Sequence, residues 1–390
     1  MDTGTFRQLL TRTGQTALAA ATELQPTEAA FLGCFEKLRK RFAAPLARAA
    51  LEMVLLRMRA RAKFPAADRM YCTREALEQA SGEVIAQYRA QRFISYGEVA
   101  DLCCGIGGDT LALASAGLGV QAVEHDPLRV AMANANAQAM GLAARIRVHE
   151  ADALTVPLPG VRTAFADPAR RAGGRRKLDP QEYTPPLSAL LSRFPADFPL
   201  GVKIAPGVAL QDVCGLRAEV EFISVDGELK ECVLWFGKLR TAARRATVLP
   251  AGNTLFANEL PAQLPLTSVS EYVFDPDPAV VRSGLATQLA TQLGLQPIDH
   301  VVALFTAPKP TPSPFLASYR VEVATRFHLQ RLREHLRQHS VGRVTVVKRG
   351  TRLDADDVVR KLKLEGEQHR TLLLTQVGGE QTMIVGEVVS

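Results

Sequence analysis

The spacing of apolar residues changes along this chain. Up to about residue 92 they recur every three or four positions, which predicts amphipathic helices that bury one stripe. Between residues 38 and 56 that stripe consists of Leu38, Phe42, Leu46, Ala49, Met53 and Leu56. Pro45 fits the first turn of a helix, and Thr73 fits an N-cap that is followed by Glu75 in the first turn. Residues 1–92 are therefore predicted to form a helical domain.

Short apolar runs alternate with helical patterns between residues 97 and 236. The predicted strands span 97–103, 119–124, 145–150, 162–167, 200–205, 219–225 and 230–236. The predicted helices span 108–117, 128–140, 185–192 and 208–214. This alternation predicts a mostly parallel sheet with helices on both faces. Only the hairpin signal Asp226-Gly227 separates the last two strands, so one antiparallel strand is expected at that end.

The rest of the chain predicts a linker and then further α/β structure. Residues 237–267 have few clear elements and read as the linker. Beyond it the pattern gives strands 269–274, 300–306, 318–326, 343–348, 371–377 and 382–388, and helices 278–293, 327–338 and 355–363. A stiff joint is expected where proline occupies every second position, at Pro308, Pro310, Pro312 and Pro314. The predicted domains are 1–92, 93–267, 268–310 and 311–390.

Composition narrows the class of protein. The chain has 390 residues, 47% of them hydrophobic, and no apolar run approaches the ~20 residues of a membrane span. Its start lacks the basic-then-apolar build of a signal peptide, so a cytoplasmic protein without a membrane part is expected. The six cysteines show no C-x-x-C spacing, and His335 and His339 have no third ligand in view. Reduced thiols and no metal site are therefore expected.

Positive charge gathers in the helical region. The net charge is +7, and the segment from Glu36 to Lys63 has nine basic residues against two acidic ones, which is also +7. The nine are Lys37, Arg39, Lys40, Arg41, Arg48, Arg57, Arg59, Arg61 and Lys63. A polyanion such as RNA is a reasonable partner for this segment. A solvated helix face explains the same charges equally well.

A glycine-rich turn follows the first predicted strand. Residues 101–109 read Asp-Leu-Cys-Cys-Gly-Ile-Gly-Gly-Asp, a strand–turn–helix unit that brings backbone close to a polar ligand. Asp101 can meet a ligand ammonium group or brace the loop. Gly105, Gly107 and Gly108 alone fit any tight βα turn equally well.

Acidic residues after the next two strands indicate which ligand is expected. Glu124 lies 19 residues past Gly105, where a carboxylate can accept both ribose hydroxyls of a nucleoside. Asp152 can accept the adenine amino group, a device that favours S-adenosylmethionine (SAM) over a nicotinamide cofactor. The predicted cofactor-binding residues are Asp101, Cys103, Gly105, Gly107, Gly108, Glu124, His125, Asp152 and Ala153.

The segment 167–171, Asp-Pro-Ala-Arg-Arg, follows the fourth strand at the edge where open α/β sheets bind substrates. An exocyclic amine is a weak nucleophile because its lone pair is delocalised into the ring. The Asp167 carboxylate and the carbonyl beside Pro168 can accept its two N–H bonds and aim the lone pair at a sulfonium methyl group. The predicted catalytic residues are Asp167, Pro168, Ala169 and Arg170.

With these motifs the chain resembles bacterial class I SAM-dependent methyltransferases that carry a C-terminal THUMP-like domain. Its core is similar to the RNA cap guanine-N2 methyltransferases. The motifs are 56–64 with 77–80, Asp101–Asp109, Asp167–Arg171, Lys203–Gly207, Glu228–Cys232 and Lys348–Gly350. The resemblance covers nearly the whole chain. It implies a seven-stranded Rossmann-like sheet, an N-terminal helical domain, ferredoxin-like and THUMP-like domains, SAM as cofactor, and structured RNA (tRNA or rRNA) as substrate.

One departure from the family pattern concerns the substrate. The cap enzymes have Asp-Pro-Pro-Trp, whose aromatic ring stacks on guanine, whereas this chain has Ala169 and Arg170. Arg170 can stack on a base or grip a phosphate, and Tyr183 is a candidate for the missing stack. The predicted substrate-binding residues are Arg170, Arg171, Arg175, Arg176, Lys177 and Tyr183. A solvated basic loop is the alternative.

The sequence therefore predicts a methyltransferase that acts on a base nitrogen of tRNA or rRNA. Two alternatives stay open: an RNA-binding protein with a vestigial SAM pocket, and a methyltransferase for a protein or small molecule. The RNA, the nucleotide, the methylated atom and the oligomeric state are not given by the sequence.

Overall fold

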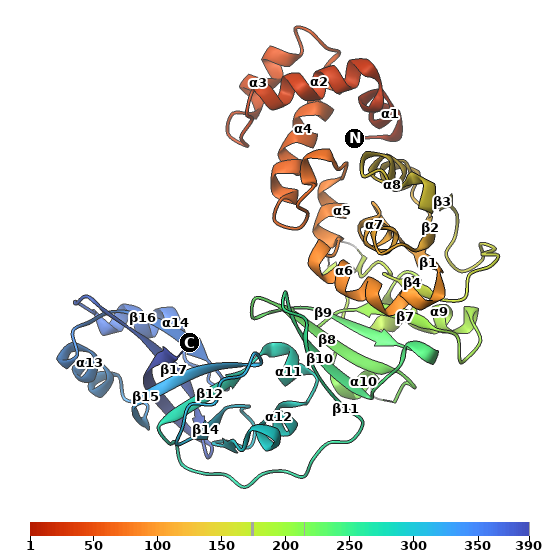
Figure 1. Cartoon of the computed structure of the whole chain (residues 1–390). Helices are drawn as coiled ribbons and strands as arrows, with labels where there is room; N and C mark the ends of the chain where they lie inside the picture. Colours follow the sequence, from red (N-terminus) through yellow and green to blue (C-terminus); the bar gives the residue numbers. More distant parts are fainter. Residues whose placement is uncertain (173–174, 214, 390) are drawn as a thin grey trace. The chain divides into compact units, whose positions relative to one another are not determined.

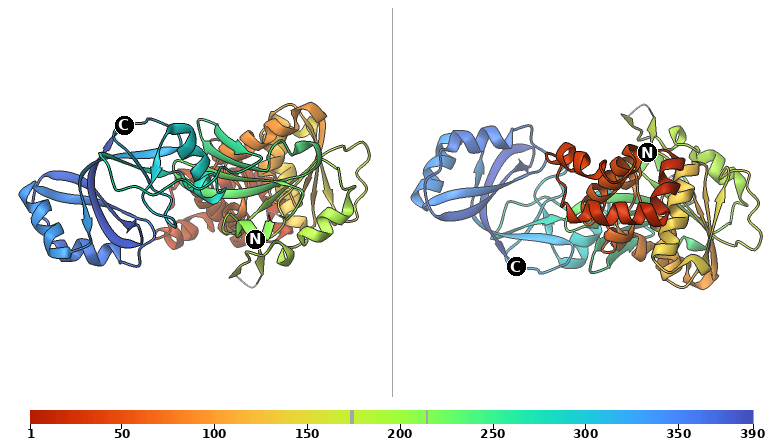
Figure 2. Two further views of the ribbon diagram at one scale, coloured as in Figure 1. Left: turned by 90° about the horizontal axis from the view of Figure 1, so that it is seen from below. Right: turned by 90° about the horizontal axis from the view of Figure 1, so that it is seen from above.

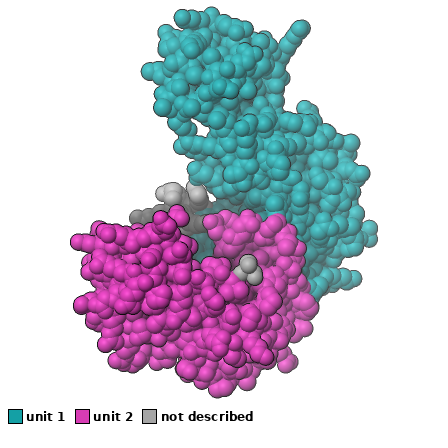
Figure 3. Space-filling view, turned by 60° about the vertical axis from the view of Figure 1, so that its left-hand side comes forward, with its two compact units in different colours: residues 1–218, 232–241 teal, residues 219–231, 242–390 magenta. Residues whose placement is uncertain are grey.

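The computed structural model describes residues 1–172, 175–213 and 215–389 (Figure 1). Internal contacts divide the chain into two compact units, coloured separately in Figure 3. The first consists of residues 1–218 and 232–241, and the second of residues 219–231 and 242–390. Each unit contains both strands and helices.

The first unit begins with the predicted helical region. Its helices are α1 (Thr3–Leu10), α2 (Arg12–Glu23), α3 (Phe31–Leu38), α4 (Ala44–Ala60), α5 (Arg74–Gln79) and α6 (Glu83–Ala90). Pro45 lies in the first turn of α4, and the Thr73 side chain accepts the Ala76 amide at the start of α5, as predicted. Phe6, Met53 and other apolar side chains form one core with Met132 of α8 (Pro127–Ala139). The helical region thereby packs directly on the sheet-bearing part (Figures 1 and 2).

A mixed sheet forms the centre of the first unit. Its strand order is β9-β7-β4-β1-β2-β3, with every pair parallel except β7 and β9. The strands are β1 (Glu98–Leu102), β2 (Gly119–Glu124), β3 (Ile146–Glu150), β4 (Ala164–Ala166), β7 (Leu200–Ile204) and β9 (Glu228–Trp235). The sheet-flanking elements are α7 (Gly108–Ser115), α8, α9 (Leu187–Arg193) and α10 (Leu210–Val213), with a small hairpin of β5 (Arg171–Ala172) and β6 (Arg175–Arg176).

The central strands β1, β4 and β7 are buried almost throughout, as expected of parallel strands covered on both faces. Gly201 is required where β7 passes β9, because a Cβ atom there would lie 2.7 Å from the Trp235 ring. The predicted alternation of strands and helices and the antiparallel strand are confirmed.

The second unit contains a segment that the prediction missed. Strand β8 (Glu219–Val225) pairs in parallel with β10 (Arg244–Leu249), and β10 pairs with β11 (Asn253–Ala257). Residues 237–267 are therefore not a plain linker. The sequence shows no clear apolar pattern here because polar residues lie inside the fold. Glu219 of β8 is fully buried, and its carboxylate binds Arg245 of β10 at 2.6 Å.

The rest of the second unit is built on one mainly antiparallel sheet with the order β13-β14-β12-β15-β18-β17-β16. Its elements are β12 (Tyr272–Pro276), α11 (Pro278–Arg282), α12 (Ala286–Leu293), β13 (Gln296–Pro297), β14 (Phe305–Ala307), β15 (Leu316–Arg326), α13 (Leu329–Gln338), β16 (Val341–Lys348), α14 (Ala355–Leu362), β17 (Gln368–Val377) and β18 (Glu380–Val389). The order of elements predicted after residue 315 is confirmed. Because β12 pairs with β15, one sheet joins the parts on either side of the proline-rich segment.

The Lys348–Gly350 motif has a structural role in this sheet. The Arg349 guanidinium binds the buried Asp275 carboxylate of β12 at 2.8–2.9 Å. Gly350 has a φ of +65°, and a Cβ atom there would overlap Val302. In the described parts of both units, no helix combines the length and apolar character that crossing a membrane requires.

Candidate functional site

A cavity of about 480 Å³ opens in the first unit where β1, β2 and β4 end. Its wall brings together most of the residues that the sequence predicts for the site. Those that line it are Cys103, Gly105, Gly108, Glu124, His125, Asp152, Ala153, Asp167, Pro168, Ala169 and Arg170. Asp101, Gly107, Lys177 and Tyr183 do not line it. The side chains of Arg171, Arg175 and Arg176 lie outside the described part of the structure.

The glycine-rich turn is shaped by left-handed backbone. Cys103, Gly105 and Gly107 have φ values of +62°, +58° and +87°, and glycine adopts this region without a side-chain penalty. Asn136 of α8 holds the turn from behind: its amide donates to the Ile106 carbonyl at 2.9 Å and to the Tyr71 carbonyl at 3.0 Å. The sequence analysis missed Asn136, whose only signal is a polar residue on an alanine-rich helix.

Asp101 lies behind the cavity and braces its floor. It is 1% exposed, and its Oδ2 accepts the Thr110 hydroxyl group of α7. Its Oδ1 has no partner in the described structure. Burial, with the neighbouring Asp109 as a smaller cause, raises the pKa of Asp101 well above its ordinary value. Of the two predicted roles for Asp101, bracing the loop is the one that the contacts support.

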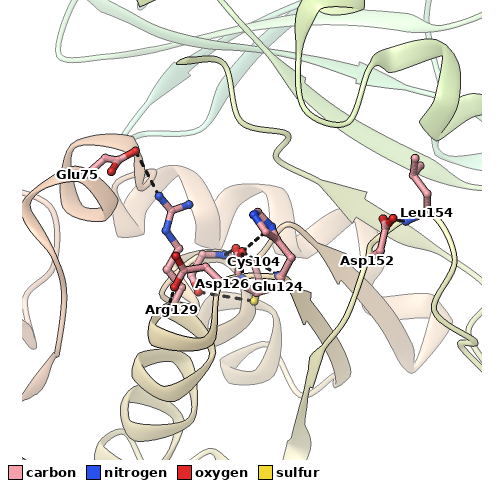
Figure 4. A network of polar contacts seen from close by, with 9 residues as sticks. Glu75, Cys104, Glu124, Asp126, Arg129, Asp152 and Leu154 are labelled. Carbon is pink, nitrogen blue, oxygen red and sulfur yellow. Dashed lines mark hydrogen bonds and ion pairs between the residues drawn. The ribbon is translucent and has the colours of Figure 1, made fainter. Parts of the chain in front are cut away.

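Glu124 stands at the end of β2 and faces the cavity (Figure 4). Its Oε2 accepts the Gly105 amide at 3.0 Å, and its Oε1 accepts the amides of His125 and Asp126 at 2.9 and 3.0 Å. A carboxylate has about four acceptor positions, so this set leaves room for a further donor, chiefly on Oε2. Asp126 caps α8 by accepting the Arg129 amide at 2.9 Å.

Asp152 lies in the turn after β3. Its Oδ1 accepts the Leu154 amide at 2.8 Å, which fixes the carboxylate, and the residue is exposed on the cavity wall (Figure 4). Glu124 and Asp152 thus present carboxylate oxygens from successive strand ends. Such a pair fits a ligand that has hydrogen-bond donors at both ends. An adenosine is such a ligand, because it carries ribose hydroxyls at one end and an amino group at the other.

Asp167 follows β4 at the other part of the same wall. Its Oδ2 binds the Lys203 ammonium group of β7 at 2.6 Å, and that ammonium also donates to the Ser81 hydroxyl at 2.8 Å. The Asp167 amide donates to the Leu102 carbonyl, which ties the segment to the end of β1. Sequence reasoning missed Lys203 and Ser81, although a lysine inside the apolar strand 200–204 was a visible signal.

Arg170 lines the cavity three residues further on. Its Nη1 atom is buried and has no hydrogen-bond partner in the described structure, so a guanidinium nitrogen there is available to an acceptor on a ligand. Ala169 pairs with Thr184 as an isolated bridge, which brings Thr184, Pro185 and Pro186 to the same wall.

Two predicted substrate contacts are not brought to the cavity. Tyr183 is 2% exposed, and its hydroxyl accepts the Ala205 amide at 3.0 Å, so its ring packs in the interior instead of offering a stacking face. Lys177 donates to the Glu182 carbonyl at 2.9 Å. Its ammonium group thus binds within its own loop.

The helical region supplies a wall that the sequence did not reveal. Five residues at and after the end of α5 line the cavity: Ala76, Glu78, Gln79, Ala80 and Ser81. The Lys63 ammonium group holds this segment by donating to the carbonyls of Leu77, Glu78 and Ala80 at 2.8–3.2 Å. An ion pair between Glu75 and Arg129 at 3.4 Å joins α5 to α8 (Figure 4).

Several members of the basic cluster therefore have partners within the protein. Lys63 binds the three carbonyls, Arg57 donates to the Met70 carbonyl, Arg61 binds Asp68, and Arg59 binds Glu28. Lys63 and Arg57 thus hold backbone carbonyls of the helical region, whereas Arg59 and Arg61 form exposed ion pairs at the surface. Among the residues described, no group of three or more His, Cys, Asp and Glu side chains is arranged to hold a metal ion.

Comparison with known proteins agrees with this geometry. The family model described as RNA cap guanine-N2 methyltransferase matches residues 97–176, the model described as THUMP domain-like matches residues 316–388, and a domain of unknown function matches residues 2–60. Two Mycobacterium tuberculosis proteins from different strains, each described as an uncharacterized S-adenosylmethionine-dependent methyltransferase, are 32% identical over 338 residues, which is 84% of this chain and 92% of theirs.

A solved structure shows the same fold. A provisionally assigned methyltransferase from Porphyromonas gingivalis is 19% identical to this chain and superimposes with a TM-score of 0.74. The match covers 94% of this chain and all of that one. The fold is thus shared with a protein whose sequence has diverged widely.

Proposed function

The chain belongs to the S-adenosylmethionine-dependent methyltransferases represented by its mycobacterial relatives, and from this we propose that it methylates a base nitrogen of tRNA or rRNA. SAM supplies an electrophilic methyl group on a positively charged sulfur atom. The finer assignments below, of residues to the cofactor and of RNA as substrate, are part of the proposal.

The strand-end carboxylates would hold the nucleoside part of the cofactor. Oε2 of Glu124 has acceptor capacity left for a ribose hydroxyl, and Asp152 presents its carboxylate for the adenine amino group. The methionine part would lie along the glycine-rich turn, where Cys103, Gly105 and Gly108 line the cavity. A cavity of about 480 Å³ is large enough for such a ligand.

Asp167 and Arg170 would serve the substrate. Oδ2 of Asp167 is held by Lys203, so Oδ1 is the oxygen available to accept an amine N–H bond. The Pro168 carbonyl is the second acceptor in the proposal, and two acceptors would pyramidalise the nitrogen and aim its lone pair. Arg170 would stack on the base or bind a phosphate through its buried, unpartnered nitrogen.

One observation carries the proposal: the Asp167–Arg170 segment lines the same cavity as Glu124 and Asp152. A substrate bound at that segment would therefore meet the cofactor directly. The THUMP domain-like match at residues 316–388 supports RNA as the substrate class. A base would enter from a single-stranded or flipped state, because the reacting atom cannot be reached inside a duplex.

The test removes the protein from its source organism and compares the modified nucleosides of purified tRNA and of purified rRNA by mass spectrometry. We expect one methylated nucleoside to be lost, and to be restored by the wild-type protein but not by Asp167→Ala. Loss of no nucleoside from either pool would reject RNA as the substrate and turn the search to proteins and small molecules.

A further inference from the structure

A buried lysine lies directly behind the reaction centre. We propose that Lys203 is a positioning residue: together with Ser81 it fixes one oxygen of Asp167, so that the other oxygen faces the atom that receives the methyl group. The proposal rests on the assignment of Asp167 to the reaction centre. It adds two residues from outside the substrate motif, one of them from the helical region.

The first argument is the cost of burying an ammonium group. Lys203 is 3% exposed in β7, between Val202 and Ile204, which are fully buried. Removing a charge from water is expensive unless it is paired, and a well-packed apolar residue is commonly as stable as a buried ion pair. A lysine in this strand therefore calls for a reason besides stability of the sheet.

The second argument is the geometry of the contacts. The Lys203 ammonium lies 2.6 Å from Asp167 Oδ2 and 2.8 Å from the Ser81 Oγ. The Asp167 side chain is still 20% exposed, and it lines the cavity. No described residue donates to Oδ1, so one oxygen is committed to the protein and the other is presented to the cavity.

The third argument is the connection that the ion pair makes between separate segments. The Lys203 ammonium group of β7 contacts the Asp167 carboxylate after β4 and the Ser81 hydroxyl group after α5. A charge-assisted hydrogen bond of this kind is shorter and stronger than a neutral one. Without it the Asp167 side chain could turn away from the cavity, so the pair holds the carboxylate in the orientation that an amine donor needs.

The experiment uses two cofactor analogues and does not depend on the substrate. Sinefungin carries an amine in place of the sulfonium methyl, whereas S-adenosylhomocysteine carries nothing there. The ratio of their dissociation constants reports how strongly the reaction centre attracts a positive group. Titration calorimetry on the full chain measures both constants at about pH 7, where the amine of sinefungin carries its proton.

We expect the wild type to prefer sinefungin. Lys203→Met, whose side chain has a similar length, removes a cation, so a purely electrostatic role of the lysine would raise this preference. A positioning role predicts the opposite: the Asp167 carboxylate is no longer held at the reaction centre, and the preference should fall about tenfold. Lys203→Arg should restore the preference. Ser81→Ala, which removes one hydrogen bond and leaves the cation, should show a smaller fall. Asp167→Asn should bind the two analogues alike.

A preference for sinefungin in Lys203→Met that equals or exceeds that of the wild type, in a protein that still binds S-adenosylhomocysteine, would overturn the proposal. Loss of binding to both analogues in Lys203→Met, with a wild-type preference in Ser81→Ala, would also reject it, because the lysine would then be only structural. Neither result depends on whether RNA is the substrate, which the nucleoside comparison decides separately. With an active substrate, Lys203→Met should lower kcat and leave the KM for SAM unchanged.

Discussion

Asp101 and Asp167 stand at the carboxyl ends of paired strands, β1 and β4, yet their surroundings differ. Asp167 has a cation on one oxygen and the cavity beside the other. Asp101 is sealed behind the glycine-rich turn, with a hydroxyl donor on one oxygen and no partner on the other. The same type of side chain thus has two surroundings: the carboxylate of Asp167 is paired and reaches the cavity, whereas burial raises the pKa of Asp101, which supports the loop.

Asparagine in place of Asp167 should give the largest effect and tests whether Asp167 and Asp101 differ in role. The change removes the charge and places an amide where an acceptor is needed, so we expect kcat/KM for methyl transfer to fall about 100- to 1,000-fold. Transfer of labelled methyl groups to RNA from a strain that lacks the gene measures the effect. Asp101→Asn is the matched control and should keep activity within about fivefold of the wild type. Equal losses in the two variants would remove the distinction between the sites.

Alanine in place of Arg170 tests the substrate side of the same strand end. The buried Nη1 has no partner in the described structure, so its removal should leave folding unchanged. We expect kcat/KM for the RNA pool to fall about 30-fold while the affinity for S-adenosylhomocysteine stays the same. Arg170→Lys keeps the charge but loses the planar fork, and intermediate activity is expected. A parallel loss of cofactor binding would place Arg170 with the cofactor instead.

Valine in place of Thr110 tests the sealed site. Thr110 is buried and its hydroxyl donates to Asp101, so the change leaves a buried acceptor without its donor. We expect the free energy of unfolding to fall by about 1–2 kcal/mol. The chain has a single tryptophan, Trp235, buried in the first unit, and its fluorescence in urea reports unfolding there. Thr110→Ser keeps the hydroxyl, so a loss as large as that of valine would point to packing.

The smallest expected effect is on how stability depends on pH. The pKa of Asp101 is raised in the folded state, so its folded form binds a proton more tightly than its unfolded form, whose ordinary value is 3.8. The stability that Asp101 contributes is present below that value and is lost as pH rises through the folded pKa. Relative to Asp101→Asn, the wild type should therefore lose stability as the pH rises from acidic to neutral. A constant difference across urea unfolding curves at several pH values would contradict this.

The sequence predicted the parts of the site that follow from strand ends. Glu124 and Asp167 come directly after apolar runs, Asp152 lies two residues beyond β3, and parallel strands bring such ends to one edge of a sheet. No role was predicted for Lys203 and Ser81, because their contacts join residues far apart in the sequence. Lys203 is 36 positions from Asp167 and 122 positions from Ser81. Local spacing carries no information about such pairs.

Errors elsewhere in the prediction have physical causes of the same kind. Tyr183 was expected to stack on a base, but burial of its ring and the hydrogen bond to the Ala205 amide place it in the interior. Strands β10 and β11 were read as a linker because charged residues interrupt the apolar alternation. Glu219 and Arg245 satisfy each other across β8 and β10, so polar positions are tolerated inside the fold.

The contacts of Lys63 limit how this enzyme can be shortened. A shortened protein that begins at β1 would keep the whole parallel sheet of the first unit, and by its fold it would look complete. It would nevertheless lack Lys63, the three carbonyls that Lys63 holds, and Ser81 behind Asp167. The helical region therefore forms part of the cavity wall, and studies of this cavity need the chain from its first helices onward.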